Sequence, residues 1–446
     1  MTFRMTVNKI GYSVTDHISA ASMNLGSHQE MMNSIRNILP KKKEELICNE
    51  NMGCGGEKFA QTVYEQFQVL LKLCQITGAP FSSNDLRPLG GKCSRLIQLY
   101  CTLMNFFRIG NLLFIANFVH FYLKLNSLLI TFYAYNVCAM ASLAVLSLRR
   151  RAVITSMKTI LKTISRVTLK SSGKKWNLRM FMWLNAFSVV IIAASIGLTV
   201  QNNRSLKEVP SAINFFGYSF ENEMREKLLV AVRFSMAFTF ISSSMMCSTT
   251  LLLSSTVYYY LSEAVCGFGL KLKKRFECKT FNQESIAGNI CMFEKIMTMV
   301  GEVDHAFSTG VLFLYGASVS CFFNALSIIL SSKRIFITLY VFVAVMFAAA
   351  LGSFFLLTHA GNRVNSKFQH LRNLLINCSG LVTQSYLSVR DLTAFTIMAQ
   401  DIRTADLHLT GGDMFIIRKD MILTVAGVMI TYGVLIFQLD KHEKVG

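Results

Sequence analysis

The sequence predicts an all-α, polytopic membrane protein with seven transmembrane helices. Of its 446 residues, 52% are hydrophobic and only 16% are charged, and the mean hydropathy is +0.42. A soluble domain carries roughly 25% charged residues. The apolar residues are gathered into runs of about 20, the length a helix needs to cross about 30 Å of hydrocarbon. Basic residues are concentrated in alternate loops between these runs.

The first 92 residues precede the apolar runs. Residues 1–55 are polar and predict a mobile cytoplasmic arm. Residues 56–92 predict an amphipathic interfacial helix followed by a linker, because Phe59, Val63 and Phe67 recur at a spacing of four before the chain reaches Pro80 and Pro88. This helix carries too many charges to cross a bilayer and is expected at its inner surface.

The predicted spans and the segments between them account for the rest of the chain. The spans cover residues 97–123, 127–148, 177–200, 228–255, 306–330, 335–358 and 420–439. We interpret the larger segments as a ligand-pocket bundle of spans one to four (93–262), a cytoplasmic helical extension into span five (263–305), spans five and six (306–358), cytoplasmic anchor helices (359–419), and a last span with a short outer tail (420–446).

The short loops predict the orientation. Residues 149–175 contain many Lys and Arg residues and no Asp or Glu, which marks a cytoplasmic loop. The amino terminus is then cytoplasmic, the carboxyl terminus extracellular, and a multi-pass protein of the plasma membrane is expected. Loop 201–226 falls outside, where Asn203 begins an Asn-Arg-Ser glycosylation triplet. Since the basic clusters that produce the +20 charge flank membrane spans, we expect contact with anionic bilayer lipid and no nucleic acid.

Catalysis finds little support, so no enzyme, cofactor or metal site is predicted: no nucleophile, base and acid can be placed together, and the histidines lack metal-ligand spacing. A small-molecule pocket in the outer half of spans two to six is the alternative, because aromatic and small polar side chains occur there together. For any single one of them, ordinary packing is the favoured explanation. The candidates are Asn126, Tyr133, Asn136, Ser195, Arg233, Phe322, Asn324 and Tyr340.

Two arginines lie inside apolar spans, Arg108 in the first and Arg233 in the fourth. Each could extend its long side chain toward an interface or donate to a backbone carbonyl. Arg233 could instead face a cavity open to the exterior. The sequence leaves these alternatives open.

The last span carries a patterned face. Thr431, Leu435 and Leu439 are spaced by four, and Gln438 adjoins them. If several copies surround an axis, the leucines would form apolar constrictions, the glutamines would offer amides to permeating ions, and Asp440 would favour cations. A buried helix whose glutamine bonds to a neighbour is an equal alternative.

Residues Thr431-Tyr432 and Gln438-Leu439, separated by five residues, resemble the carboxyl-terminal signature of arthropod gustatory receptors, with Leu439 in place of phenylalanine as in the related olfactory co-receptor. The Gly411–Phe415 approach and the seven-span architecture agree. The resemblance implies a ligand-gated, non-selective cation channel opened by a tastant such as a sugar or a bitter compound. It further implies a homotetramer, or a heteromer with related receptors, with a central pore lined by the last helix, where Leu435 and Leu439 match the gate and Gln438 the pore-lining amide.

Two other classes remain open. A G-protein-coupled receptor would need its amino terminus outside, which would turn the basic loop 149–175 outward against the charge rule. A secondary transporter should show paired charges at the midplane and interrupted helices, and the sequence lacks both.

Overall fold

The computed structural model describes residues 54–86, 95–122, 127–167, 213–215, 218–220, 222–277, 283–330, 337–383, 389–405 and 407–443. All of them belong to one compact unit that runs from Gly53 to Gly446. Residues 1–53 of the predicted arm and the predicted span 177–200 lie outside the described residues.

The periodic segment near the amino terminus forms helix α3 (Cys54–Ile76). Its apolar residues, among them Val63, Phe67 and Leu70, are fully buried. The helix ends in a Schellman motif, in which Ala79 N–H donates to the Cys74 carbonyl at 2.8 Å and Gly78 N–H to the Gln75 carbonyl at 3.1 Å. Gly78 has a φ of +87°, which glycine adopts at low cost. A short 3₁₀ helix, η1 (Ser83–Leu86), follows.

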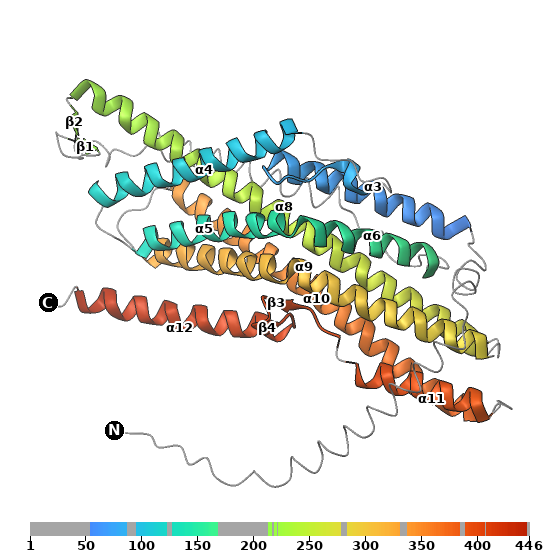
Figure 1. Cartoon of the computed structure of the whole chain (residues 1–446). Coiled ribbons are helices and arrows are strands. Elements are labelled where there is room, and N and C mark those ends of the chain that lie inside the picture. Colours follow the sequence, from blue (N-terminus) through green and yellow to red (C-terminus); the bar gives the residue numbers. More distant parts are fainter. Residues whose placement is uncertain are drawn as a thin grey trace, which may run out of the picture. The chain divides into compact units, whose positions relative to one another are not determined.

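Helices α4 (Arg95–Tyr122) and α5 (Ser127–Leu148) coincide with the first two predicted spans. Helix α6 (Arg150–Val167) then continues α5 almost end to end (Figure 1). Its apolar residues Val153, Met157, Ile160 and Ile164 are spaced by three and four and are fully buried, on the side that packs against α3, α8 and α9. The sequence interpretation recognised only the charge of this segment and missed the helix.

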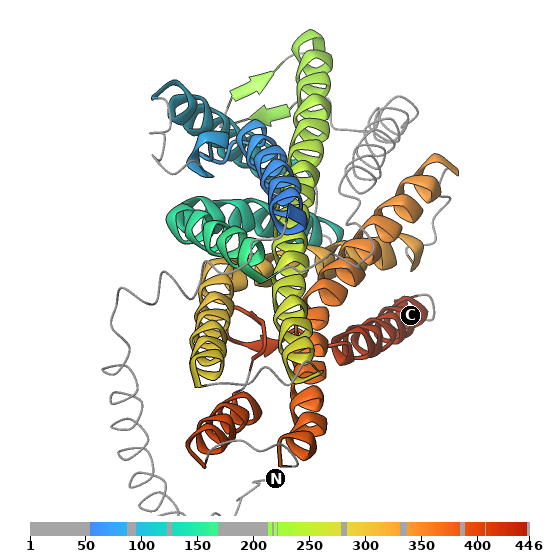
Figure 2. The same ribbon diagram turned by 90° about the vertical axis from the view of Figure 1, so that its right-hand side faces the viewer.

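Three long helices pass through the unit: α8 (Asn222–Glu277), α9 (Gln283–Leu330) and α10 (Ile337–Thr383) (Figure 2). Helix α10 packs along α8, and α5 packs along α9. With 56, 48 and 47 residues, each is longer than a bilayer requires. Residues 263–305, predicted as an extension into span five, are divided between the end of α8 and the start of α9. Helix α11 (Val389–Thr404) packs against α9 and α10.

The structure is mostly helical, although two short antiparallel hairpins depart from the all-α prediction. Strands β1 (Ile213–Phe215) and β2 (Tyr218–Phe220) pair with Asn214 opposite Ser219. Strands β3 (Thr410–Gly411) and β4 (Phe415–Ile416) pair just before helix α12 (Asp420–Glu443). Gly412 and Asp413, with φ of +60° and +59°, turn the chain between β3 and β4. Strands of two or three residues leave too little alternation in a sequence to be recognised.

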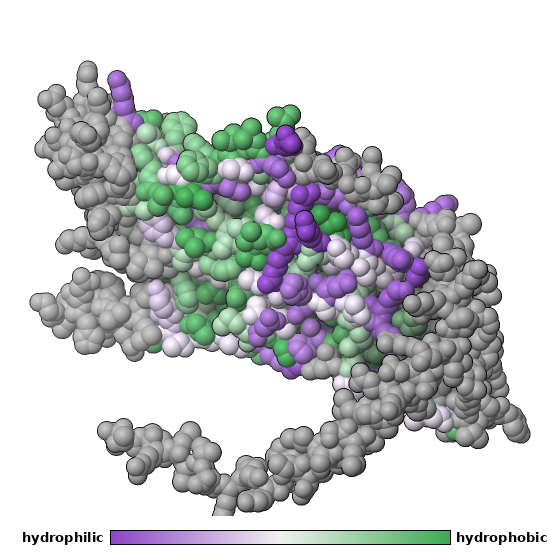
Figure 3. All heavy atoms as spheres, viewed as in Figure 1, coloured by the Kyte–Doolittle hydropathy of each residue, from purple (hydrophilic) through white to green (hydrophobic). Residues whose placement is uncertain are grey.

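Within the described part of the chain, four helical stretches are long and apolar enough to cross a membrane: Arg95–Ala116, Val230–Glu277, Gly288–Leu326 and Val343–Asn377. Two shorter apolar stretches are Phe132–Leu148 and Asp420–Val434. Figure 3 shows hydrophobic side chains gathered over α4 and the adjoining bundle, and hydrophilic ones toward α6. Helix α4 exposes the large apolar side chains of Leu99, Leu103, Phe106 and Leu113. An exposed apolar surface of this kind is typical of contact with lipid or with another protein. The protein is a membrane protein.

Candidate functional site

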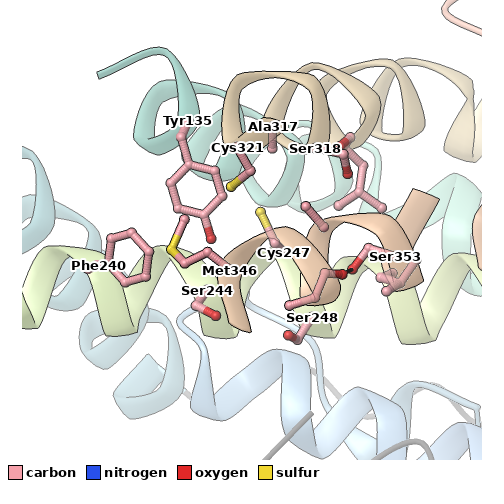
Figure 4. A pocket seen from close by; sticks show the side chains of 14 residues that line it. Tyr135, Phe240, Ser244, Cys247, Ser248, Ala317, Ser318, Cys321, Met346 and Ser353 are labelled. Carbon is pink, nitrogen blue, oxygen red and sulfur yellow. Dashed lines mark hydrogen bonds between the residues drawn. The ribbon is translucent and has the colours of Figure 1, made fainter. Parts of the chain in front are cut away.

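A cavity lies where α5, α8, α9 and α10 meet (Figure 4). Its volume is about 60 Å³. The lining residues come from all four helices: Tyr135 from α5; Phe240, Ser244, Cys247, Ser248 and Leu251 from α8; Leu314, Ala317, Ser318 and Cys321 from α9; and Met346, Ala349, Ala350 and Ser353 from α10.

The lining is apolar with a few hydroxyl and thiol groups, and none of these residues carries a charge. Hydroxyls come from Tyr135 and from serines on three helices, while Cys247 and Cys321 bring free thiols from α8 and α9 (Figure 4). A charged ligand would lose its hydration here without gaining a partner of opposite charge, a cost of several kcal/mol. The chemistry therefore favours an uncharged ligand that offers a few hydrogen-bonding groups.

The cavity is small for a ligand. An engineered protein cavity of about 150 Å³ is known to hold one benzene molecule. The present cavity, at about 60 Å³, is less than half that size. A ring-sized ligand therefore requires the lining side chains or the helices that carry them to move.

Buried polar contacts beside the cavity join α5 to α8. The Ser243 hydroxyl donates to Asn136 Oδ1 at 2.6 Å, and Asn136 Nδ2 donates to the Phe132 carbonyl at 2.7 Å. The ring of Tyr135 stacks on Phe240 with 5.6 Å between centroids. These contacts fix the α5 and α8 walls to each other.

The β3–β4 hairpin joins the final helix to α9. Thr410 donates to Asp304 from its backbone N–H at 2.6 Å and from its hydroxyl at 2.8 Å, and Gly412 N–H donates to the Ser308 carbonyl at 2.9 Å. Farther along α12, the ring of Tyr432 lies 4.4 Å from that of Phe323 on α9. Helix α12 thus follows α9 from the hairpin onward, while Leu423, Val428, Ile430 and Val434 are exposed.

No protein-family model and no curated protein sequence matches the chain. Solved structures do match. The insect olfactory receptor OR5 from Machilis hrabei aligns with a TM-score of 0.57 at 13% identity, covering 85% of this chain and 99% of that one. Its complex with eugenol aligns with a TM-score of 0.51 at 13% identity, covering 86% and 98%. The chain has the insect olfactory receptor fold.

Four predicted pocket residues have described side chains in this insect olfactory receptor fold, and none of them lines the cavity. Tyr133 and Asn136 lie on α5 beside Tyr135, and Phe322 and Asn324 lie on α9 beyond Cys321. Phe322 packs against Phe347 and Phe354. Asn136 is used in the contact between α5 and α8, whereas Asn324 Oδ1 and the Tyr133 hydroxyl are buried without a hydrogen-bond partner among the described residues. Their roles in ligand binding stay predictions.

The remaining predicted residues cannot be compared with the cavity. Asn126, Ser195 and Asn203 lie outside the described residues. Arg233 belongs to α8 and Tyr340 to α10, but their side chains also lie outside the described part.

Small residues leave the space for the cavity, which the aromatic residues Tyr135 and Phe240 also line. Ser244 and Ser248 are four residues apart on α8, and α9 and α10 contribute Ala317, Ser318, Ala349, Ala350 and Ser353. Small side chains at helical spacing leave room between packed helices. Small residues at helical spacing in α8, α9 and α10 were therefore the signal in the sequence that could have located the cavity.

The predicted pore residues all belong to α12. Thr431 is exposed and its hydroxyl donates to the Gly427 carbonyl at 3.0 Å. The side chains of Leu435, Gln438 and Leu439 lie outside the described part, so their pore roles stay predictions. Among the described residues, no group of three His, Cys, Asp or Glu side chains is arranged to hold a metal ion.

Proposed function

We propose that the chain is a gustatory-type chemoreceptor that acts as a ligand-gated, non-selective cation channel in the plasma membrane, opened by a small uncharged tastant. The observation that carries this proposal is the uncharged, hydroxyl-bearing cavity enclosed by four helices of an insect olfactory receptor fold. The neighbour determined in complex with eugenol supports small-molecule binding by this fold.

The gustatory assignment and the channel activity rest on the final helix. Thr431-Tyr432 and Gln438-Leu439 resemble the gustatory receptor signature, and Tyr432 packs on α9. The exposed apolar side chains of α12 favour burial against lipid or against other subunits. A homotetramer, or a heteromer with related receptors, around an axis lined by α12 accounts for both the signature and this exposure.

The cavity narrows the choice of tastant. Sugars and uncharged bitter compounds both suit a lining with hydroxyl groups. A sugar, however, presents hydroxyls all around its ring, and each one buried without a partner would weaken binding. Because much of the lining is apolar, we favour an uncharged bitter compound with one or two polar groups.

Heterologous expression with whole-cell recording tests this function. The panel should pair each uncharged tastant with a permanently charged analogue of similar size, together with simple sugars. We expect inward cation current with some of the uncharged compounds and none with their charged analogues. Ser318→Leu, which fills the cavity from α9, should shift the concentration dependence, whereas Leu103→Val on the exposed face of α4 serves as the control. Responses restricted to charged ligands would contradict the proposed pocket.

The orientation can be tested separately by glycosylation mapping. The channel proposal requires modification at Asn203 and none at an acceptor introduced near residue 20. The reverse pattern would support a G-protein-coupled receptor orientation and rule out the proposed channel topology.

A further inference from the structure

Tyr315 occupies the junction between the cavity and the hairpin that precedes α12. It follows Leu314, which lines the cavity, and its side chain is 4% exposed. Its hydroxyl shares a 2.9 Å hydrogen bond with Thr358 Oγ1 of α10. Its ring meets Phe354 of α10 edge-on at 5.1 Å between centroids, and Phe415 of β4 at 5.5 Å. One side chain therefore contacts both a cavity-forming helix and the hairpin.

The same face of α9 carries the other attachments of the hairpin. Asp304, Ser308, Tyr315 and Ser318 are separated by four, seven and three residues, which places them along one side of a helix. Asp304 and Ser308 bind the hairpin, and Ser318 lines the cavity. One face of the continuous helix α9 therefore contacts both the cavity and the hairpin.

The hairpin has little room to move independently. A Cβ placed on Gly412 would come within 2.7 Å of Leu312 Cδ2 of α9. On α10, a Cβ on Gly361 would come within 2.6 Å of Ile417 Cγ2, just after β4. Closely packed interiors transmit strain instead of absorbing it. A shift between α9 and α10 must therefore change the surroundings of β4.

A ligand would produce such a shift, because the cavity of about 60 Å³ is too small for a ring and has walls from both α9 and α10. We propose that Tyr315 is the residue that couples widening of the cavity to movement of the β3–β4 hairpin, and through it to α12. This inference rests on the proposed function for its physiological meaning, although the mechanical coupling is a property of the fold itself. Tyr315 is a positioning residue, since it does not line the cavity.

The test uses a substitution in place of the unidentified ligand. Ala317→Phe puts an aromatic ring into the cavity from α9 and should force it to widen. Hydrogen exchange of the full-length purified protein, read in peptides that cover residues 407–417, reports on the hairpin amides of Thr410 and Gly412. The variants compared are wild type, Ala317→Phe, Tyr315→Leu and the double variant.

The matched control is Tyr260→Leu combined with Ala317→Phe. Tyr260 is also a buried tyrosine, but its 2.6 Å hydrogen bond to Gln66 and its edge-on contact with Phe67 join α8 to α3 and not to the hairpin. If Ala317→Phe fails to fold, as judged by gel filtration, Ser318→Met fills the same cavity more gently.

We expect Ala317→Phe to accelerate hairpin exchange by about fivefold or more, a usual size for coupling between sites. In the Tyr315→Leu background, Ala317→Phe should accelerate exchange little further. In the Tyr260→Leu background, it should have its full effect. An equal effect in the Tyr315→Leu background, or no effect in the wild type, would overturn the coupling. Whole-cell currents of the same variants separate the two proposals. If Ala317→Phe accelerates hairpin exchange through Tyr315 but no variant carries current, the channel is contradicted. If the variants carry current but hairpin exchange does not depend on Tyr315, the role of Tyr315 is contradicted.

Discussion

Arg108 of α4 donates a hydrogen bond from Nε to the hydroxyl of Ser242 on α8 at 2.6 Å. The same guanidinium donates from Nη1 to the Thr77 carbonyl, also at 2.6 Å, just after the end of α3. Arg108 is 6% exposed. The charged side chain of Arg108 therefore links α4 to α8 and to the end of α3. Of the alternatives that the sequence left open, donation to a backbone carbonyl is confirmed for Arg108.

Replacing Arg108 with methionine should destabilise the protein. Methionine keeps an apolar stem but leaves the Thr77 carbonyl and the Ser242 hydroxyl without their donor, and hydrogen bonds to charged groups contribute about 1.5–3 kcal/mol each. We expect the thermal midpoint in detergent, followed by fluorescence-detected gel filtration, to fall by several degrees. Arg95→Met, at an exposed position of the same helix, should change it little. Equal effects of both substitutions would remove Arg108 from this structural role.

Gly78→Ala tests the junction between α3 and α4. An alanine would have to adopt the φ of +87°, and its Cβ would lie 2.8 Å from Nη1 of Arg108. The left-handed conformation costs a non-glycine residue about 1–2 kcal/mol, and the displaced guanidinium adds to that cost. A lower thermal midpoint is expected. Gly110→Ala, where a Cβ meets nothing within 4 Å, is the matched control and should be neutral or slightly stabilising.

Cys74 should resist thiol reagents in the folded protein. It is fully buried in α3, and burial raises the pKa of its thiol from 9.0 to about 12. Because the thiolate is the reactive species, maleimide at pH 8 should leave Cys74 unlabelled until the protein is unfolded in detergent. Peptide mass spectrometry measures both states. The raised pKa also means that the thiol's contribution to stability is complete below about pH 9 and is lost as the pH rises toward 12. Labelling of Cys74 at equal rates in both states would contradict its burial.

The ion pair between Asp85 and Arg150 should matter more than an exposed one. Arg150 Nη2 lies 2.7 Å from Asp85 Oδ1, with side chains 22% and 5% exposed, and Asp85 also accepts from Ser82 N–H at 2.9 Å. Asp85→Asn should lower the free energy of unfolding by about 2 kcal/mol, because it leaves a largely buried guanidinium without its partner.

The control for this pair is Lys273 and Glu277, which are 3.7 Å apart and more than half exposed. Glu277→Gln should cost about 0.5 kcal/mol or less. Thermal unfolding of both variants in the same detergent makes the comparison. If the exposed pair proved as costly as the buried one, the contact between η1 and α6 would not contribute as described.

The predictable part of the fold is the part with a strong periodic or compositional signal. The apolar runs located α4 and α5 to within two residues, and the period of α3 was visible because Phe59, Val63 and Phe67 recur every four residues. Helix α6 was missed because its basic residues dominated the interpretation, although Val153, Met157, Ile160 and Ile164 repeat at helical spacing. The interpretation used these charges only to predict the side of the membrane and overlooked the buried face of the helix.

The pocket was less predictable, because it depends on packing between helices distant in sequence. Tyr133 and Asn136 were chosen for their chemistry, yet Tyr135 between them lines the cavity. A one-residue step on a helix turns a side chain by about 100°, so the correct helix does not give the correct residue. The partner of Asn136, Ser243, lies over a hundred positions away, and no local pattern reveals such a contact.

The relative permeability of Gln438→Ala tests most directly whether α12 lines a cation pathway opened from the cavity. Reversal potentials are measured under bi-ionic conditions in cells that express the wild type, Gln438→Ala or the control Met429→Leu. Each protein is also measured in the Ala317→Phe background, so that opening does not depend on a known ligand. We expect a cation current whose permeability ratios change in Gln438→Ala and are unchanged in Met429→Leu. Identical ratios in all three proteins, or the absence of current from correctly folded protein at the cell surface, would contradict it.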